Sequence, residues 1–116
     1  MLADGHRARV GSGILISGAS SYGARPGALF IDSRTVSRKH AWLREDRGRV
    51  EIVDLGSTNG TWIEGSRIEA FRAVEVGPDA RVRISFGRSV RAALEFGSIG
   101  EDRESEWRED RQHRSR

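Results

Sequence analysis

"VSRKHAW" at residues 36–42 and "DLGSTNGTW" at residues 54–62 are the two stretches that indicate the fold most specifically. The first places a serine, two cations and a histidine side by side. The second places small polar residues between two glycines. Neither stretch looks like a core segment, and neither is a catalytic signature by itself.

The GSTNG sequence at 56–60 predicts a tight loop between two strands. Gly56 and Gly60 allow positive φ, which most residues avoid, and Asn59 tolerates it. The loop offers the hydroxyls of Ser57 and Thr58. It also offers the carboxamide of Asn59, which both donates and accepts hydrogen bonds and therefore suits gripping a peptide backbone. Taken alone, the same residues are more typical of a plain β-turn.

The SRKH residues suit an anion. Ser37 offers a hydroxyl donor and Arg38 a forked cation, and both are favourable partners for phosphate. His40 opens the next strand, where a histidine is more often a core residue than a ligand or a base. A Ser37–His40 nucleophile pair would need an acid partner and a G-x-S-x-G elbow, and neither accompanies it. The second stretch lacks the G-K-[ST] ending of a P-loop. We therefore expect neither an enzyme nor nucleotide binding.

Composition excludes several further classes of site. The 116 residues suit one domain, and the chain has no cysteine, which removes disulfides and thiolate zinc sites. The three histidines show no metal-ligand spacing, so neither a metal nor another cofactor is expected. No apolar run reaches roughly 18 residues, and residues 1–10 lack the apolar core of a signal peptide. We expect a cytoplasmic protein with no membrane partner.

The basic residues are almost all of one kind. Nineteen arginines stand against one lysine, Lys39, and the formal net charge is +3. Arginine is favoured where bidentate contact with phosphate or carboxylate matters, although most side chains of an arginine-rich chain simply lie in solvent. Because no aromatic interleaving or RNA-binding motif accompanies the arginines, nucleic acid is not an expected partner.

Short apolar runs separated by glycines predict an all-β fold. Val82, Ile84 and Phe86 alternate with polar residues over 80–86, and a second alternating run covers 89–96, with residues 87–88 as a two-residue hairpin turn. A tight turn also joins TWIEG to SRI. The pattern predicts a β-sandwich of about ten short strands in two antiparallel or mixed sheets. Further strand candidates lie at 13–17, 28–31, 39–45 and 49–55.

The two ends of the chain look different from its middle. The alternating pattern stops at Phe96, and residues 100–116 hold six acids, five arginines and one large apolar residue, Trp107. Such a segment buries too little apolar surface to fold alone, although its charges would support a solvated helix from Ser105. We expect an N-terminal arm at 1–9, a domain at 10–97, and a charged tail or short helix at 98–116.

Together the two stretches closely resemble the forkhead-associated (FHA) domain family, whose pattern is a Gly-Arg pair, then S-R-x-H, then S-x-N-G. The matches are SRKH at 37–40 and LGSTNGTWIEG at 55–65, at family-like spacing. The resemblance covers the chain from about Val10 to Phe96. It implies an FHA-type β-sandwich whose apical loops bind phosphothreonine peptides.

The resemblance also implies roles for single residues. Ser37 would hydrogen-bond the phosphate, and Arg38 would contact the phosphate or the peptide backbone beside it. Thr58 would help to form the pocket for the threonine methyl group, Asn59 would clamp the peptide main chain, and Ser57 would also contact the peptide. The remaining motif residues would be structural: His40, Gly56 and Gly60.

Two positions depart from the family pattern. The family's arginine belongs near residues 22–23, which are Tyr22–Gly23 here, and the nearest arginine is Arg25. Because a phosphothreonine carries a charge of about −1.5 to −2, a second cation is expected beside Arg38. We expect Arg25 to bind the phosphate in this role, with Arg34, three residues before Ser37, as the rival candidate. Glu64 replaces a frequent asparagine, and a carboxylate near the peptide groove disfavours acidic ligands.

We therefore predict a phosphothreonine-dependent peptide- or protein-binding module in Ser/Thr kinase signalling. Its partner would be a phosphothreonine-containing protein or peptide, without a small-molecule substrate. The alternative is an FHA-fold protein-interaction scaffold that has lost phosphate recognition and binds protein surfaces through its sheets.

Overall fold

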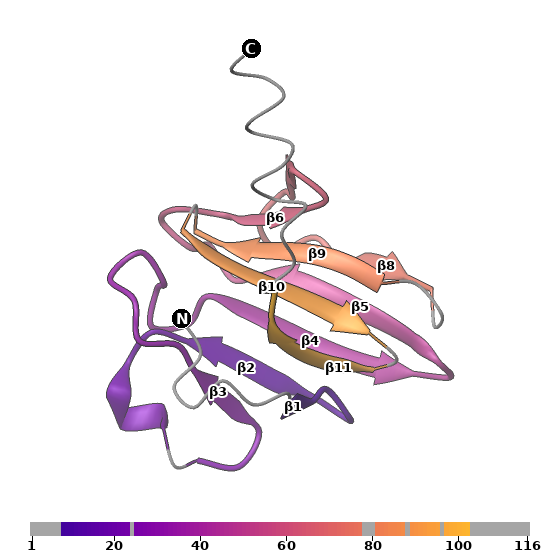
Figure 1. Ribbon diagram of the computed structural model, residues 1–116, viewed down its shortest axis with the longest axis horizontal. Coiled ribbons are helices and arrows are strands. Elements are labelled where there is room, and N and C mark those ends of the chain that lie inside the picture. The colour runs from indigo at the N-terminus through magenta and orange to yellow at the C-terminus, as the bar shows by residue number, and fades with distance from the viewer. Residues whose placement is uncertain (1–7, 24, 78–80, 88, 96, 103–116) are drawn as a thin grey trace.

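The computed structural model describes residues 8–23, 25–77, 81–87, 89–95 and 97–102. Within these residues, eleven short strands form two sheets packed face to face (Figure 1). The predicted all-β sandwich is confirmed. Its sheets are joined by short connections, which include one turn of 3₁₀ helix, η1, at Ser20–Tyr22.

The larger sheet has six strands, and every neighbouring pair in it is antiparallel. The strand order across this sheet is β1, β11, β10, β9, β6 and β7. Their bounds are Ala8–Arg9, Ser98–Glu101, Val90–Glu95, Arg81–Phe86, Thr61–Ile63 and Ser66–Arg67.

The second sheet has five strands in the order β3, β2, β4, β5 and β8. It is mixed, because β2 and β3 run parallel while the other pairs are antiparallel. The bounds are Ala28–Phe30, Ile14–Ser17, Ala41–Asp46, Arg49–Asp54 and Val74–Val76.

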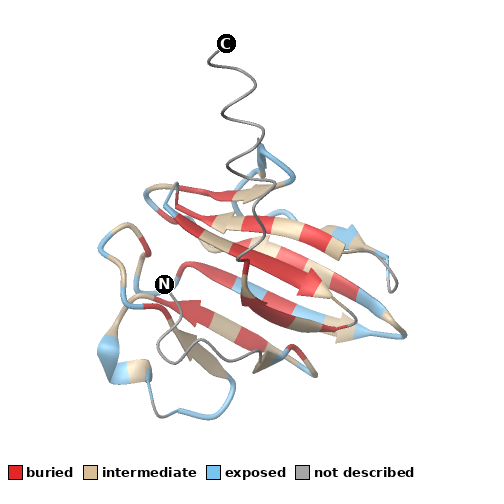
Figure 2. Ribbon diagram, viewed as in Figure 1, coloured by how far each residue is buried: buried red, intermediate tan, exposed pale blue. Residues whose placement is uncertain are grey.

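The core follows from the two-residue period of the strands. The predicted inward residues of β9, Val82, Ile84 and Phe86, are at most 6% exposed. Opposite them, β5 contributes Val50 and Ile52 to the same cluster. Figure 2 shows the buried residues gathered in the strands and the exposed ones in the connections. Full burial of such a side chain contributes about 1.5–3 kcal/mol, so the paired sheets form a stable platform for the loops.

The sheet extends past Phe96, where the sequence pattern predicted its end. Strand β11 pairs with both β10 and β1, and Ile99 in it is fully buried. The pattern missed this strand because Ile99 is its only large apolar residue. Ala8 and Arg9, predicted to be part of the arm, pair with β11. Residues 103–116, with Trp107 and the predicted helix, lie outside the described residues.

Three connections meet at the end of the sandwich toward which β2 points in Figure 1. We call residues 18–23, 31–40 and 55–60 the loop end. The backbone N–H of Gly18 donates to the Ser37 carbonyl at 2.9 Å, and the N–H of Thr58 donates to Ser37 Oγ at 3.1 Å. The fold thus brings the two motifs together, although Thr58 follows Ser37 by 21 residues along the chain.

Candidate functional site

His40 lies beneath the loop end and joins two of its connections. Its side chain is fully buried; Nδ1 accepts a hydrogen bond from the Ser37 backbone N–H at 3.0 Å, and Nε2 donates to the Gly60 carbonyl at 2.8 Å. These partners require the neutral ring with its proton on Nε2. Burial lowers the pKa of His40, against smaller opposing effects of the Gly60 carbonyl and the Asp54 charge. The ring is therefore a neutral brace.

The same geometry removes His40 as a base for Ser37. Both ring nitrogens are occupied by backbone groups, and Ser37 Oγ accepts from the Thr58 N–H instead. Ser37 is half-buried at the surface of the loop end. Within the described residues no group accepts its hydroxyl proton, which leaves this proton for an anion.

Asp54 holds the GSTNG loop in shape. Its Oδ1 accepts hydrogen bonds from Ser57 Oγ at 2.6 Å and Thr61 Oγ1 at 2.7 Å, and its Oδ2 accepts from the N–H groups of Gly56 and Ser57 at 3.0 and 3.1 Å. Burial raises the pKa of Asp54, but the four hydrogen bonds together lower it by more, so the pKa of the folded protein lies below the usual value. The loop is therefore held by an ionised carboxylate before any ligand arrives.

The three central residues of the loop point in different directions. Ser57 is buried, and its hydroxyl also accepts from the Gly60 N–H at 3.0 Å. It therefore shapes the loop from inside, whereas the sequence predicted a contact with the peptide. Thr58 is exposed. Asn59 is half-buried, and its Nδ2 donates to the Thr35 carbonyl at 3.0 Å. Within the described residues its Oδ1 has no donor, so it can accept one more hydrogen bond.

Gly60 is required by both its backbone and its surroundings. Its φ of +90° is a left-handed value that disfavours other residues. A Cβ placed there would lie 2.5 Å from Nε of Arg67. Gly56 also has a left-handed φ, +79°, and a Cβ placed there would lie 2.9 Å from Cζ of the Phe71 ring.

The cations nearest to Ser37 along the chain are Arg34, Arg38 and Lys39. All three are exposed, and none forms an ion pair within the described residues. Arg25 is placed differently, because its guanidinium lies 4.9 Å from the centre of the Tyr22 ring, at cation–π distance. The structure thus holds Arg25 against Tyr22, with no contact to Ser37.

Glu64 does not act as the sequence suggested. With Gly65 it forms the predicted tight turn between β6 and β7, and both residues have positive φ. Its carboxylate accepts the Arg83 backbone N–H at 2.8 Å and pairs with the Arg83 guanidinium at 3.2 Å. The charge is therefore compensated at the sheet. The 87–88 turn also differs, since residues 87–89 lie between the paired Phe86 and Val90.

Sequence reasoning missed three residues that organise the loop end. Asp54 stands two and three residues before the N–H groups that it binds, which is the spacing of an Asx-turn and was a usable signal. Thr35 offers its carbonyl to Asn59. Arg67 lies across the GSTNG loop, with a 3.5 Å contact from its guanidinium to the Thr58 carbonyl. Nothing local in the sequence indicates either of these two contacts.

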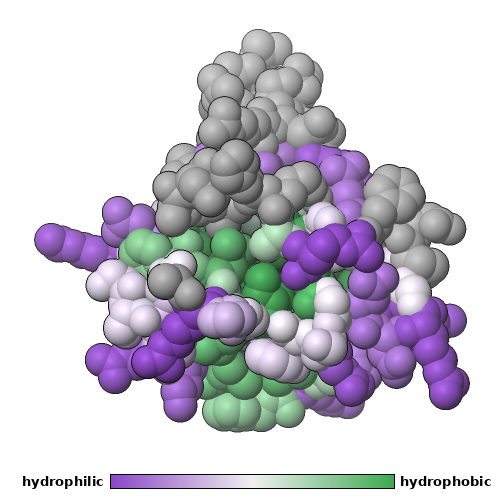
Figure 3. Space-filling view, turned by 90° about the horizontal axis from the view of Figure 1, so that it is seen from below, coloured by the Kyte–Doolittle hydropathy of each residue, from purple (hydrophilic) through white to green (hydrophobic). Residues whose placement is uncertain are grey.

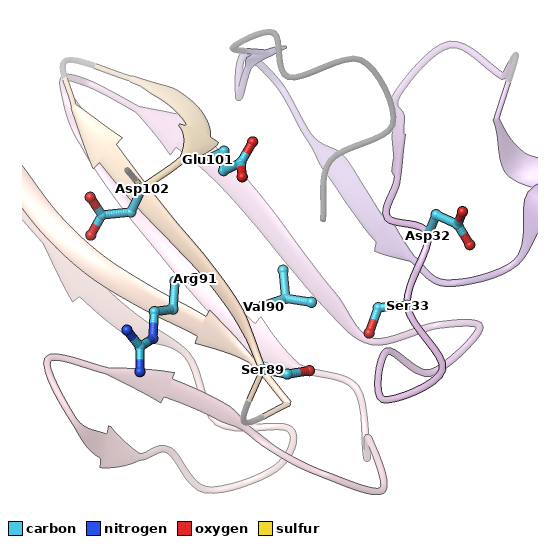
Figure 4. Close-up of a pocket in the computed structure, with 7 residues that line it drawn as sticks. All are labelled: Asp32, Ser33, Ser89, Val90, Arg91, Glu101 and Asp102. Atoms are coloured by element: carbon cyan, nitrogen blue, oxygen red, sulfur yellow. The ribbon is translucent and has the colours of Figure 1, made fainter. Parts of the chain in front are cut away.

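A hollow of about 390 Å³ lies beside the loop end (Figure 4). Ser33 and Ser89, which line it, both hydrogen-bond the hydroxyl of Thr35, whose carbonyl accepts from Asn59. Three carboxylates line it against one arginine, so its charge disfavours phosphate. The lining residues are Asp32, Ser33, Ser89, Val90, Arg91, Glu101 and Asp102.

Among the described residues, no group of three or more histidine and carboxylate side chains is placed to hold a metal ion. In the same part of the chain, no helix has the length and apolar character needed to span a membrane.

Comparison with known families gives a match that covers most of the sandwich. The family model of the FHA domain matches residues 18–89. The chain is 51% identical over 35 residues to an oxoglutarate dehydrogenase inhibitor of Corynebacterium glutamicum, over 30% of this chain and 24% of that protein. It is 38% identical over 52 residues to the glycogen accumulation regulator GarA of Mycolicibacterium smegmatis, over 44% and 33% of the two chains. The matched part thus spans a third or less of these relatives.

Solved structures agree with this match. The FHA-2 domain of an ABC transporter from Mycobacterium tuberculosis superposes with a TM-score of 0.60 at 25% identity, covering 80% of this chain and 76% of that one. The FHA domain of a Chlamydia trachomatis protein gives a TM-score of 0.56 at 20% identity, covering 81% and 77%.

Proposed function

The chain belongs to the FHA domain family, and we propose that it is a phosphothreonine-dependent binding module that docks proteins phosphorylated by Ser/Thr kinases. The observation that carries the proposal is the Ser37 hydroxyl. It is fixed by the Thr58 N–H, its own proton has no acceptor in the described part of the chain, and the exposed Arg38 follows it directly. A donor and a forked cation at one fixed place suit a phosphate.

The proposal gives each motif residue one role. Ser37 and Arg38 bind the phosphate, Thr58 contacts the threonine methyl group, and Asn59 Oδ1 accepts a backbone N–H of the peptide. Ser57 supports the loop from inside, as do the structural residues His40, Gly56 and Gly60.

A phosphate of charge about −2 needs more than one cation. Arg34 is exposed and unpaired in the described structure, and it belongs to the same connection as Ser37. Arg25 is the weaker candidate, because moving it to Ser37 breaks its stacking on Tyr22. We therefore propose Arg34 as the second cation.

The proposal includes no catalysis. A nucleophilic serine needs a base on its hydroxyl, and the nitrogens of His40 are bound to Ser37 N–H and Gly60 O. The role is thus binding alone, and the partner is a protein or peptide.

The test is calorimetric titration with peptides selected from a phosphothreonine library, each compared with its unphosphorylated form. A few charge-assisted bonds less ordering losses give an expected dissociation constant on the order of micromolar. Ser37→Ala should weaken binding about tenfold or more, the loss of one charge-assisted bond. Ser12→Ala, which removes an exposed hydroxyl outside the loop end, is the control. Equal affinity for phosphorylated and unphosphorylated peptides would refute the proposal.

One observation favours the second candidate, a scaffold that no longer reads phosphate. Trp42 and Phe71 are 38% and 71% exposed. Seen from the side of β2 and β3, hydrophobic residues also form a continuous area across the middle of the surface, with hydrophilic side chains to either side (Figure 3). Exposed apolar surface of this kind suits contact with another protein. Partner binding that survives both dephosphorylation and Ser37→Ala would favour the scaffold.

A further inference from the structure

Arg67 is a cation at the loop end that lies outside both sequence motifs. It ends β7, and its guanidinium contacts the Thr58 carbonyl at 3.5 Å. Ser37 contacts the N–H of the same residue at 3.1 Å. Ser37 and Arg67 therefore bind the two backbone groups of Thr58, one from each end of the residue.

The guanidinium is held in place by its neighbours. Its Nε lies close against the α-carbon of Gly60, where a Cβ would be 2.5 Å away. Its Cζ lies 5.9 Å from the centre of the Trp62 ring, at the outer limit of a cation–π contact. An aromatic ring beside a guanidinium limits its freedom, so less entropy is lost when it binds an anion.

No carboxylate within the described residues compensates this charge. The two acids on either side of it in the chain are engaged elsewhere: Glu64 pairs with Arg83 at 3.2 Å, and Glu69 pairs with Arg72 at 2.9 Å. Several other arginines of the described residues, such as Arg44 and Arg49, form ion pairs with carboxylates, whereas Arg67 forms none there. It is exposed, with donors left over after the long contact to Thr58.

We propose that Arg67 recognises an anionic side chain of the bound peptide, a carboxylate or a second phosphate, close to the phosphothreonine. The inference rests on the proposed function, because it takes the phosphate to lie at Ser37. Through Thr58, the Arg67 guanidinium lies within about 10 Å of Ser37 Oγ, given ordinary backbone dimensions. An extended peptide advances about 3.3 Å per residue, so the anionic residue lies within about three residues of the phosphothreonine.

The competing explanation is that Arg67 only braces the loop through Thr58 and Gly60. A brace would strengthen binding of every phosphopeptide equally. A reader of anions would strengthen binding only of peptides that carry a second negative charge. The ratio of the two affinities therefore separates the explanations, because a structural defect cancels from it.

The experiment uses the full chain and three matched sets of phosphothreonine peptides. The first set is neutral at the positions that flank the phosphothreonine. The second carries a single glutamate, placed in turn at each of the three positions before and the three positions after the phosphothreonine. The third carries a phosphoserine at the position where glutamate binds best. Fluorescence anisotropy should show a preference of about three- to tenfold for one glutamate position over neutral, as expected for a partly exposed arginine–carboxylate contact. The phosphoserine peptide should bind more tightly still.

Arg67→Gln should abolish this preference, and Arg67→Lys should retain part of it. Arg72→Gln, which removes an exposed arginine already paired with Glu69, is the matched control and should keep the full preference. The preference should also shrink as salt is raised, because the contact is exposed. An acidic preference that persists in Arg67→Gln, or a loss that is equal for neutral and acidic peptides, would overturn the inference. So would a wild-type chain that binds phosphothreonine but ignores flanking charge.

Failure of the proposed function has a different signature. If the wild-type chain binds the neutral peptide equally well with threonine and with phosphothreonine, phosphate reading itself is absent, and the inference falls with it.

Discussion

Replacing Asp54 with asparagine is the sharpest test of how the GSTNG loop is held. The two side chains have nearly the same shape, so the change removes charge and one acceptor while adding two donors. In its best orientation, the asparagine oxygen takes the place of Oδ2 and still accepts from the N–H groups of Gly56 and Ser57. The amide nitrogen then faces the hydroxyls of Ser57 and Thr61, which donated to Oδ1.

The expected loss follows from those four bonds. Two N–H bonds lose their charge assistance, and two buried hydroxyl protons lose their acceptor. An unsatisfied buried group costs about 1–3 kcal/mol, and the hydroxyls can relax in part, so Asp54→Asn should lower the free energy of unfolding by about 2–4 kcal/mol. Urea denaturation followed by tryptophan fluorescence measures this. Glu69→Gln, which breaks an exposed ion pair, should change the same quantity by about 0.5 kcal/mol or less.

Acid provides an independent check on the same residue. The pKa of Asp54 is lowered by folding, so its contribution to stability is present above the unfolded pKa of about 3.9 and is lost as the pH falls through the lower folded pKa. Asp54→Asn should lack this part of the acid-induced loss. A variant less than about 1 kcal/mol below the wild type at pH 7, with an unchanged acid profile, would refute the role assigned to the carboxylate.

Four further outcomes follow from the structure. Folding lowers the pKa of His40, so the free energy of unfolding should fall as the pH drops below about 6.5, where the unfolded chain binds a proton that the folded chain does not. In a His6→Gln, His113→Gln background His40 is the only histidine. A free energy of unfolding in urea that stays constant between pH 7 and 5 in this background would contradict the burial of His40 as a neutral ring. Arg34→Gln should weaken phosphopeptide binding about fivefold or more while Arg25→Gln changes it less than twofold, and the reverse order in calorimetry would reassign the second cation. Phosphothreonine should bind better than phosphoserine by about 0.8 kcal/mol or more, the value of one buried methyl group, and equal affinities would mean that Thr58 lines no methyl pocket. A chain ended at residue 97 loses the buried Ile99 and the 2.8 Å Arg81–Asp102 ion pair, so its free energy of unfolding should be about 3 kcal/mol lower than that of a chain ended at residue 103. Equal melting curves of the two chains would show that β11 is dispensable.

The strands were predictable where their information is local. Alternation in β9 marks Val82, Ile84 and Phe86 as inward-facing, and all three are buried. The pattern fails for β11, because Ile99 stands alone among glycines and small polar residues. That strand is fixed by pairing with β10 and β1, and such pairing depends on residues far away in the sequence.

The site was predictable in its composition but not in its side-chain directions. The motifs bring Ser37 and Thr58 together, as their 3.1 Å hydrogen bond shows. No sequence signal separates the buried Ser57 from the exposed Thr58 next to it, because the difference arises from Asp54 beneath the loop. Likewise, Glu64 could be placed beside the groove, but its pairing with Arg83 depends on the β6–β9 register.

Charge at the loop end is compensated beneath the loops and uncompensated at their surface. The base of the site is compensated, with a neutral His40 and an ionised Asp54 that accepts four hydrogen bonds. The rim carries Arg34, Arg38 and Arg67, which have no carboxylate partner within the described residues. Ordering a loop during binding subtracts from affinity, whereas a loop already fixed by its own hydrogen bonds avoids that loss. Uncompensated exposed cations repel one another mildly in the free protein, so an anionic ligand relieves this repulsion as it binds. A rigid compensated base below a rim of free cations therefore favours a compact, multiply charged anion over a neutral peptide.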